Sequence, residues 1–258
     1  MNKKLLSGNE AIARGAWEAG VEVAAAYPGT PSTEILENIA RYPEIYSEWS
    51  SNEKVALDVA IGAAYAGKRA MAAMKHVGLN VASESLFYAS YTGVNAGLVI
   101  VNADDPGLHS SQNEQDNRHY AKFAKVPMLE PSDSQEAKEM VGAALALSEQ
   151  FDTPVILRTT TRTSHAKSAV EVGERKSLPK RAYEKNPQKY VMIPGYAKRR
   201  HPVVEERMVK LAEYARAGKP VRIFGIPNAI FEILHELEMR EPIPMPPKSY
   251  LITGGGWK

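Results

Sequence analysis

The apolar and polar residues of the first 162 positions alternate between two spacings. Stretches with an apolar residue at every third or fourth position, typical of helices, are separated by short runs of valine, isoleucine and alanine, typical of buried strands. The pattern predicts helices over 9–20, 31–41, 52–66, 80–92, 118–124 and 133–150. It predicts strands over 21–26, 45–49, 69–74, 97–102, 126–129 and 154–160.

Strands and helices that take turns along a chain are typical of a parallel sheet covered by helices on both faces. The runs at 97–102 and 154–157 are apolar at both alternations, as expected for strands buried on both faces. We therefore predict an α/β fold, a doubly wound parallel sheet, as a first domain over residues 1–162.

Capping sequences mark several of the predicted helix starts. The segments 7–10, 50–53 and 132–135 match the capping-box pattern of a hydroxyl residue followed three positions later by Glu or Gln. Thr30 before Pro31 matches an N-cap followed by proline at the first helical position.

Composition narrows the class of protein. The 258 residues carry 32 Lys and Arg against 30 Asp and Glu, and this net charge of +2 excludes a strongly cationic nucleic-acid-binding protein as a description of the whole chain. Because cysteine is absent, the chain offers no disulfide, thiolate zinc site or iron–sulfur ligand. No apolar run approaches the roughly 20 residues of a membrane span. The N-terminus turns polar too early for a signal peptide, so we expect a cytoplasmic protein.

The chain changes character after the last predicted strand. Residues 158–201 contain twelve Lys and Arg against three Glu, a net charge of +9. We predict a basic linker arm and helix over 163–217, which is either a solvated connector or a surface that docks an acidic partner or the next domain. We predict a small strand–helix–strand tail over 218–258, too short to bury a core of its own.

Polar residues follow four predicted strands, at the edge where parallel sheets bind ligands. The hydroxyls of residues 27–34 (YPGTPSTE) lie at a helix start and can bind a carboxylate or phosphate, or can simply cap the helix. Glu53 opens the next helix, where a capping role competes with a catalytic one. His76 and Gly78 follow a further strand, although a lone histidine is more often structural.

The loop after the strand at 97–102 is also rich in polar residues. Its acidic residues and His109 lack the regular spacing of metal ligands, so we predict no metal site in this chain. Arg118 opens the following helix, where it can pair with a ligand carboxylate or lie on the surface.

Longer blocks carry a resemblance to a known family. The segments occur in order at 8–11 (GNEA), 27–34 (YPGTPSTE), 75–80 (KHVGLN), 110–116 (SSQNEQD) and 157–162 (LRTTTR). Over about residues 5–214 the chain resembles the alpha subunits of indolepyruvate ferredoxin oxidoreductase, of the thiamine-diphosphate-dependent 2-oxoacid:ferredoxin oxidoreductases. The resemblance implies oxidative decarboxylation of indolepyruvate or another aryl pyruvate, with coenzyme A, and electron transfer to ferredoxin.

The resemblance also implies roles for single residues. Residues 1–162 would form the domain that holds the aminopyrimidine ring of thiamine diphosphate, and the segment 52–63 (NEKVALDVAIGA) places at Glu53 the glutamate that hydrogen-bonds the ring nitrogen. The residues implied to contact the cofactor are Glu53, Pro28, Gly29, His76 and Gly78. Those implied to contact the substrate carboxylate are Thr30 and Arg118. His76 and Gly78 replace a turn of the pyruvate enzymes, a change that suits a larger aromatic substrate.

The chain also departs from the family pattern. The family's alpha subunit continues into a domain that binds magnesium and the diphosphate, and into a cysteine-rich part that holds iron–sulfur clusters. We therefore expect this chain to be inactive alone and to act with a beta-type subunit and in a homo-oligomer.

Other functions remain open from the sequence. Residues 219–258 resemble a fragment of the acyl-protein synthetase family of adenylate-forming enzymes, which leaves a chimeric fragment as one alternative. A non-catalytic assembly or interaction module is another. Few aromatic residues interleave the basic arm, so no nucleic-acid partner is expected, and no membrane partner either.

Overall fold

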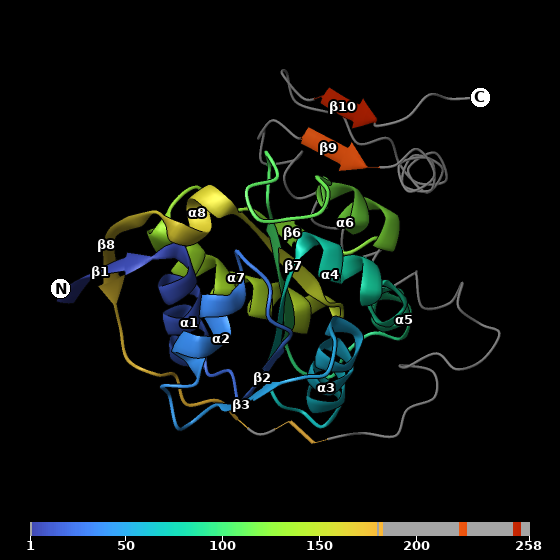
Figure 1. Cartoon of the computed structure of the whole chain (residues 1–258). Helices are drawn as coiled ribbons and strands as arrows, with labels where there is room; N and C mark the ends of the chain where they lie inside the picture. Colours follow the sequence, from blue (N-terminus) through green and yellow to red (C-terminus); the bar gives the residue numbers. More distant parts are fainter. Residues whose placement is uncertain (1, 180, 183–221, 226–249, 254–258) are drawn as a thin grey trace. The chain divides into compact units, whose positions relative to one another are not determined.

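The computed structural model describes residues 2–179, 181–182, 222–225 and 250–253 (Figure 1). The chain forms two units, Met1–Tyr190 and Val191–Lys258. In the second unit, β9 (Arg222–Gly225) and β10 (Tyr250–Thr253) pair in parallel, which confirms the two strands expected in the tail. The sequence pattern also predicts a strand near 190–193 and helices over 202–216 and 228–241, and these ranges lie outside the described residues.

The first unit is built on a six-stranded parallel sheet with the order β3–β2–β4–β5–β7–β6. The strands are β2 (Val23–Ala26), β3 (Tyr46–Trp49), β4 (Ala70–Lys75), β5 (Leu98–Asp104), β6 (Met128–Leu129) and β7 (Val155–Thr160). All six overlap the predicted strands, and every pairing between them is parallel, so the predicted α/β fold is confirmed.

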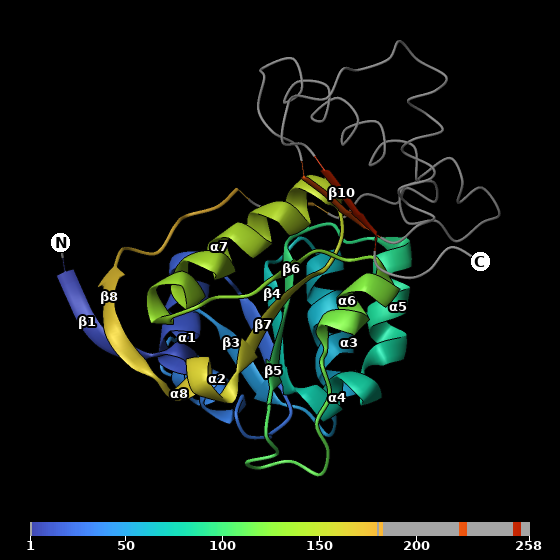
Figure 2. The ribbon, with the colours of Figure 1, turned by 90° about the horizontal axis from the view of Figure 1, so that it is seen from above.

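Helices cover both faces of this sheet, as Figure 2 shows. One face carries α1 (Gly8–Glu18), α2 (Thr33–Ile39) and α7 (Ser134–Phe151). The other face carries α3 (Glu53–Tyr65), α4 (His76–Val81), α5 (Ser83–Thr92) and α6 (Arg118–Ala124). The sheet is thus doubly wound.

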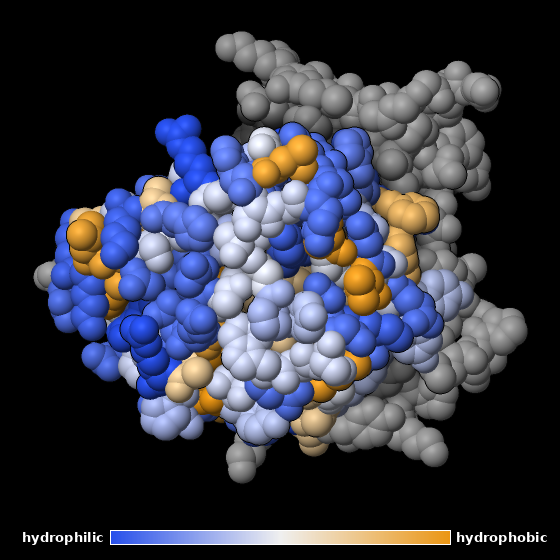
Figure 3. All heavy atoms as spheres, in the orientation of Figure 1, coloured by the Kyte–Doolittle hydropathy of each residue, from blue (hydrophilic) through white to orange (hydrophobic). Residues whose placement is uncertain are grey.

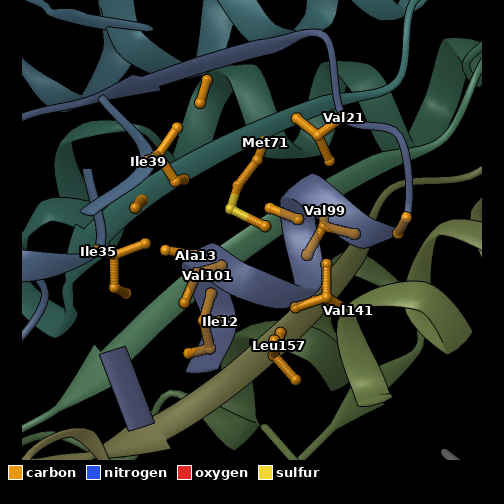
Figure 4. Packing of buried hydrophobic residues seen from close by; sticks show 14 of the residues in the cluster. Ile12, Ala13, Val21, Ile35, Ile39, Met71, Val99, Val101, Val141 and Leu157 are labelled. Carbon is orange, nitrogen blue, oxygen red and sulfur yellow. The ribbon is translucent and has the colours of Figure 1, made fainter. Parts of the chain in front are cut away.

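Alternating residues of the central strands fill two separate cores. Met71, Val99 and Leu157 point toward α1, α2 and α7, where they pack with residues such as Ile12 (Figure 4). Ile100 and the residues of β4, β5 and β7 on its side of the sheet point toward α3–α6. Burial on both faces explains why these strands read as continuous apolar runs.

Three elements were not predicted from the sequence pattern, and one predicted helix is divided in two. The strands β1 (Asn2–Ser7) and β8 (Lys167–Val172) form an antiparallel pair, and α8 (Thr161–His165) precedes β8. Residues 161–172 therefore hold regular structure at the start of the predicted basic arm. The expected helix over 80–92 is two helices, since α4 begins at His76 and α5 follows Ala82.

The predicted helix starts are partly wrong. The capping box at 7–10 is confirmed, because Ser7 and Glu10 bond each other's backbone amides. The N-cap of α3 is Asn52 rather than a residue at 50, and the N-cap of α7 is Asp133. The Thr30–Pro31 peptide bond is cis, and α2 begins at Thr33, so Thr30 is not the N-cap of that helix.

On the face drawn in Figure 3, hydrophobic residues occur as separate patches between hydrophilic ones. Among the helices of the described residues, none is long and apolar enough to cross a membrane.

Candidate functional site

The strand order predicts a ligand-binding crevice at one point of the carboxyl edge of the sheet. The neighbouring strands β2 and β4 lead to helices on opposite faces, β2 to α2 and β4 to α4. Parallel sheets bind ligands at such a point, where the chain leaves adjacent strands in opposite directions. The segments that meet here are residues 27–32 after β2 and 75–78 after β4, and the 105–117 loop follows the next strand.

Glu53 is the first residue of α3 and is only 8% exposed. Asn52 caps the helix by accepting a hydrogen bond from the Val55 amide at 2.9 Å, so the capping role considered for Glu53 is wrong. Among the described residues, the Glu53 carboxylate has no hydrogen-bond or ion-pair partner. A shielded carboxyl group that no protein donor engages is available to a ligand.

Gly78 lies directly against the Glu53 side chain. A Cβ added at Gly78 would lie 2.6 Å from Cγ and 2.7 Å from Oε1 of Glu53, distances that real Cβ atoms do not show. A larger residue at position 78 would therefore force the Glu53 side chain out of this position. The structure brings together two residues that the sequence separates by a helix and a strand.

The segment 27–32 is held in place by hydrogen bonds to the first residue of α2 and to α1. The Gly29 amide donates to the Thr33 hydroxyl at 2.9 Å, and Asn9 donates to the Pro31 carbonyl at 2.8 Å. Pro28 and Thr30 are left exposed at the crevice, and Gly29 is half-buried. These three predicted site residues thus lie on the expected edge of the sheet.

His76 is fully buried, in contrast to the exposed ligand contact that its position in the sequence suggests. Its Nε2 lies 3.0 Å from the Asn113 carbonyl oxygen, which can only accept, so Nε2 carries the proton. The His76 carbonyl accepts hydrogen bonds from Gln115 and Asn117. The residue therefore ties α4 to the 105–117 loop, and its cofactor contact stays a prediction.

A buried ion pair that the sequence analysis did not find supports the same loop. Asp104 is 1% exposed and accepts a hydrogen bond from Arg158 Nε at 2.8 Å and one from the Asn117 amide at 3.1 Å. Burial raises the pKa of Asp104, although these hydrogen bonds oppose the rise. Arg158 also pairs with Glu130. The block at 157–162 was the one signal that pointed to Arg158.

The next residue, Asp105, organises the loop itself. Its carboxylate accepts hydrogen bonds from the Thr161 hydroxyl at 2.6 Å, the Ser110 amide at 2.7 Å and the Ser111 hydroxyl at 2.8 Å. Burial works against the charged form, but these hydrogen bonds lower the pKa of Asp105 to about 2. A hollow of about 300 Å³ lies beside it, lined by Pro106, His109, Thr160, Thr161 and Arg162.

Arg118 has a partner within its own chain. Its Nε lies 2.8 and 3.0 Å from the two carboxylate oxygens of Asp116, and Nη2 lies 2.8 Å from Oδ2. The Arg118 hydrogen bonds lower the pKa of Asp116 to about 2. The guanidinium is therefore engaged by a carboxylate two residues away, and its contact with a substrate stays a prediction.

Residues 14–217 match the family described as pyruvate flavodoxin/ferredoxin oxidoreductase, thiamine diphosphate-binding. The chain belongs to this family. The matched range contains every strand of the six-stranded sheet and every candidate residue of the crevice.

Curated relatives give the relationship in more detail. The chain is 50% identical over 226 residues to the indolepyruvate oxidoreductase subunit IorA of Archaeoglobus fulgidus, covering 84% of this chain and 36% of that subunit. It is 46% identical over 260 residues to the subunit IorA of Methanothermobacter thermautotrophicus, covering 94% of this chain and 42% of that subunit. The chain thus spans well under half the length of these relatives.

Two further proteins are more distantly similar to this chain. The 2-oxoglutarate synthase subunit KorA of Methanothermobacter thermautotrophicus is 30% identical over 186 residues, covering 68% of this chain and 49% of that subunit. The structure of 2-oxoglutarate:ferredoxin oxidoreductase from Magnetococcus marinus, with 2-oxoglutarate, coenzyme A and succinyl-CoA bound, superimposes with a TM-score of 0.64 at 17% identity. That match covers 98% of this chain and 62% of the other.

In this member of the oxidoreductase family, one part of the crevice suits the cofactor named in the family description. The Glu53 carboxyl has a shielded position, a glycine against it and no protein partner among the described residues. A nitrogen heterocycle can supply the missing hydrogen bond. The described residues contain no group of three or more His, Asp or Glu that could hold a metal ion.

Proposed function

We propose that this chain provides the pyrimidine-binding side of the thiamine diphosphate site in an indolepyruvate:ferredoxin oxidoreductase. The reaction is the oxidative decarboxylation of indolepyruvate or another aryl pyruvate with coenzyme A, with electrons passing to ferredoxin. The identity of 46–51% to six subunits named IorA supports this substrate class over the 2-oxoglutarate class, since KorA relatives are 29–30% identical.

The observation that carries the proposal is the position of Glu53. When bound, thiamine diphosphate supplies the nucleophilic carbon that attacks the 2-oxo group. Glu53 would hold a proton at a nitrogen of the pyrimidine ring, because the residue is only 8% exposed and no donor among the described residues engages its carboxyl. Gly78 would leave room for that carboxyl, since a Cβ at residue 78 would lie 2.6 Å from Cγ of Glu53 and displace it.

The remaining residues of the crevice take supporting roles in the proposal. Pro28 and Gly29 would border the ring, and Thr30 would donate its hydroxyl to the substrate carboxylate. His76 would act indirectly, by holding α4 and the 105–117 loop together. Magnesium, the diphosphate and the iron–sulfur clusters would be bound outside residues 2–179. A beta-type subunit, a homo-oligomer and a cytoplasmic setting complete the proposal.

The test is proton exchange at the thiazolium carbon, followed by NMR in deuterated water, in the assembled enzyme that contains this chain. We expect Glu53→Gln to slow the exchange by at least about 100-fold, the usual contribution of a positioned acid–base group. Glu84→Gln is the matched control, because Glu84 is an exposed carboxylate paired with Lys54. Exchange at the normal rate in the Glu53→Gln enzyme would refute the proposal.

A further inference from the structure

Lys75 carries a positive charge at the carboxyl end of β4 and has no acidic partner among the described residues. It is the last residue of β4, the strand next to β2 at the point where the chain leaves in opposite directions. Its Nζ donates a hydrogen bond to the Ser110 carbonyl at 2.8 Å. Among the described residues, no carboxylate oxygen lies within 4.0 Å of Nζ. An ammonium group has three N–H donors, so two remain for a ligand.

The Lys75 side chain is also held close to the segment that carries Thr30. A Cβ added at Gly29 would lie 2.8 Å from Cδ and 3.0 Å from Cγ of Lys75, so a larger residue there would displace the Lys75 side chain. The next residue along that segment is Thr30, which is exposed. An ammonium and a hydroxyl therefore come from adjoining segments of one crevice.

Three other cations near this edge already have acidic partners. Arg118 is bound by Asp116, Arg158 by Asp104 and Glu130, and Lys54 by Glu84. Arg162 lacks an acidic partner among the described residues, but it lines the hollow beside β7, two strands away from β4. Among the described segments that follow β2 and β4, Lys75 is thus the cation available to an anion.

We propose that Lys75 binds the carboxylate of the 2-oxoacid substrate. This inference rests on the function proposed above and names the charged residue that recognises the substrate class. Lys75 forms an ion pair with the carboxylate, together with the Thr30 hydroxyl, and takes no part in bond breaking. The role implied for Arg118 by the family resemblance passes to a cation that no described carboxylate neutralises.

The test compares a charged and a neutral probe of the same shape. Dissociation constants of indole-3-propionate and indole-3-propionamide are measured by titration calorimetry on the assembled enzyme. We expect the carboxylate to bind more tightly than the amide, and Lys75→Gln to weaken carboxylate binding by about 10- to 100-fold, as for the loss of a hydrogen bond to a charged group. Amide binding should change by less than about threefold. Lys75→Arg should keep most of the preference for the carboxylate over the amide.

Arg162→Gln is the matched control, because it removes an equally unpaired positive charge from the same edge of the sheet. It should leave both constants unchanged. Equal weakening of both probes by Lys75→Gln would show that Lys75 only joins the two loops, and would overturn the inference. A wild-type enzyme without preference for the carboxylate would overturn it as well.

The proposed function and this inference can fail separately. Normal thiazolium exchange in Glu53→Gln, together with a lost carboxylate preference in Lys75→Gln, would remove the first and support the second. The reverse pair of results would keep the proposed function and remove Lys75 as its carboxylate-binding residue.

Discussion

At the scale of single residues, the site depends on glycines that allow close contacts. Gly78 lies against the Glu53 carboxyl group and Gly29 against the Lys75 stem. The sequence indicated Glu53, Gly29 and Gly78 through the resemblance, but spacing alone left each with a structural alternative. The pairings could not be predicted, because each one joins residues from different strand ends.

Gly78→Ala tests the contact with Glu53. The new methyl group would lie 2.6–2.9 Å from Cγ and the carboxylate, so the carboxyl must move away from its position. We expect thiazolium exchange to slow by about tenfold or more, given the sensitivity of catalysis to misplacement of about 1 Å.

Gly62→Ala is the matched control for that variant. Gly62 lies in the interior of α3, and a Cβ added there meets nothing within 4 Å. We expect it to stabilise the chain by about 0.5–1 kcal/mol and to leave exchange unchanged. Slowed exchange in Gly62→Ala, or normal exchange in Gly78→Ala, would contradict this account of the contact.

At the scale of elements, periodicity predicted the buried parts well. All six strands of the main sheet and most of its helices follow the predicted ranges, because residues packed on two faces leave continuous apolar runs. The elements that were missed are short or exposed. β1 is exposed over its first four residues, and its partner β8 lies about 160 positions away, so neither strand has a local signal.

The buried ion pair that holds the 105–117 loop could not be predicted, for a related reason. Arg158 lies on β7 and Asp104 on β5, and their adjacency follows from the strand order rather than from spacing. Buried ion pairs of this kind are invisible in a hydrophobic pattern. The sequence pattern predicts a polar loop that begins at Asp104, whereas Asp104 is the last residue of β5 and both Asp104 and Asp105 are only 1% exposed.

Asp105 gives the 105–117 loop a dependence on pH. Its pKa of about 2 lies below the ordinary value of 3.8, so the folded chain favours the charged form. The resulting stability, about 2 kcal/mol, is complete above pH 3.8 and is lost as the pH falls toward 2. We expect Asp105→Asn to lower the free energy of unfolding by about this amount at pH 7, measured by urea denaturation.

The difference between wild type and Asp105→Asn should shrink as the pH falls from 4 to 2. Glu37→Gln is the control, since Glu37 is an exposed carboxylate of α2 without a hydrogen-bond partner among the described residues. It should change stability by less than about 0.5 kcal/mol. A difference between wild type and Asp105→Asn that stays constant with pH would contradict the role of the Asp105 charge.

At the scale of the whole molecule, family membership selects among functions that the residues left open. The match over residues 14–217 favours an oxidoreductase subunit over a non-catalytic assembly module or a chimera with an adenylate-forming enzyme. The resemblance of residues 219–258 to acyl-protein synthetases stays a prediction, as do the boundaries at 162 and 217.

Hydrogen exchange tests how stability is distributed over the first unit. β5 is buried along its whole length, whereas β1 is largely exposed and pairs only with β8. Exposed, weakly packed elements open more often than core strands. We therefore expect amides of β1 and β8 to exchange at least about 100-fold faster than those of β5, measured by mass spectrometry. Equal protection of β1 and β5 would contradict this.

The central claim is that the Glu53 carboxyl faces a heteroaromatic ring in the crevice between β2 and β4. A crystal structure of the assembled enzyme with thiamine diphosphate tests it most directly. We expect a Glu53 carboxylate oxygen within about 2.6–3.2 Å of a pyrimidine nitrogen, with Gly78 against the same carboxyl group. A ring bound elsewhere, with the Glu53 carboxyl turned into solvent, would contradict the claim.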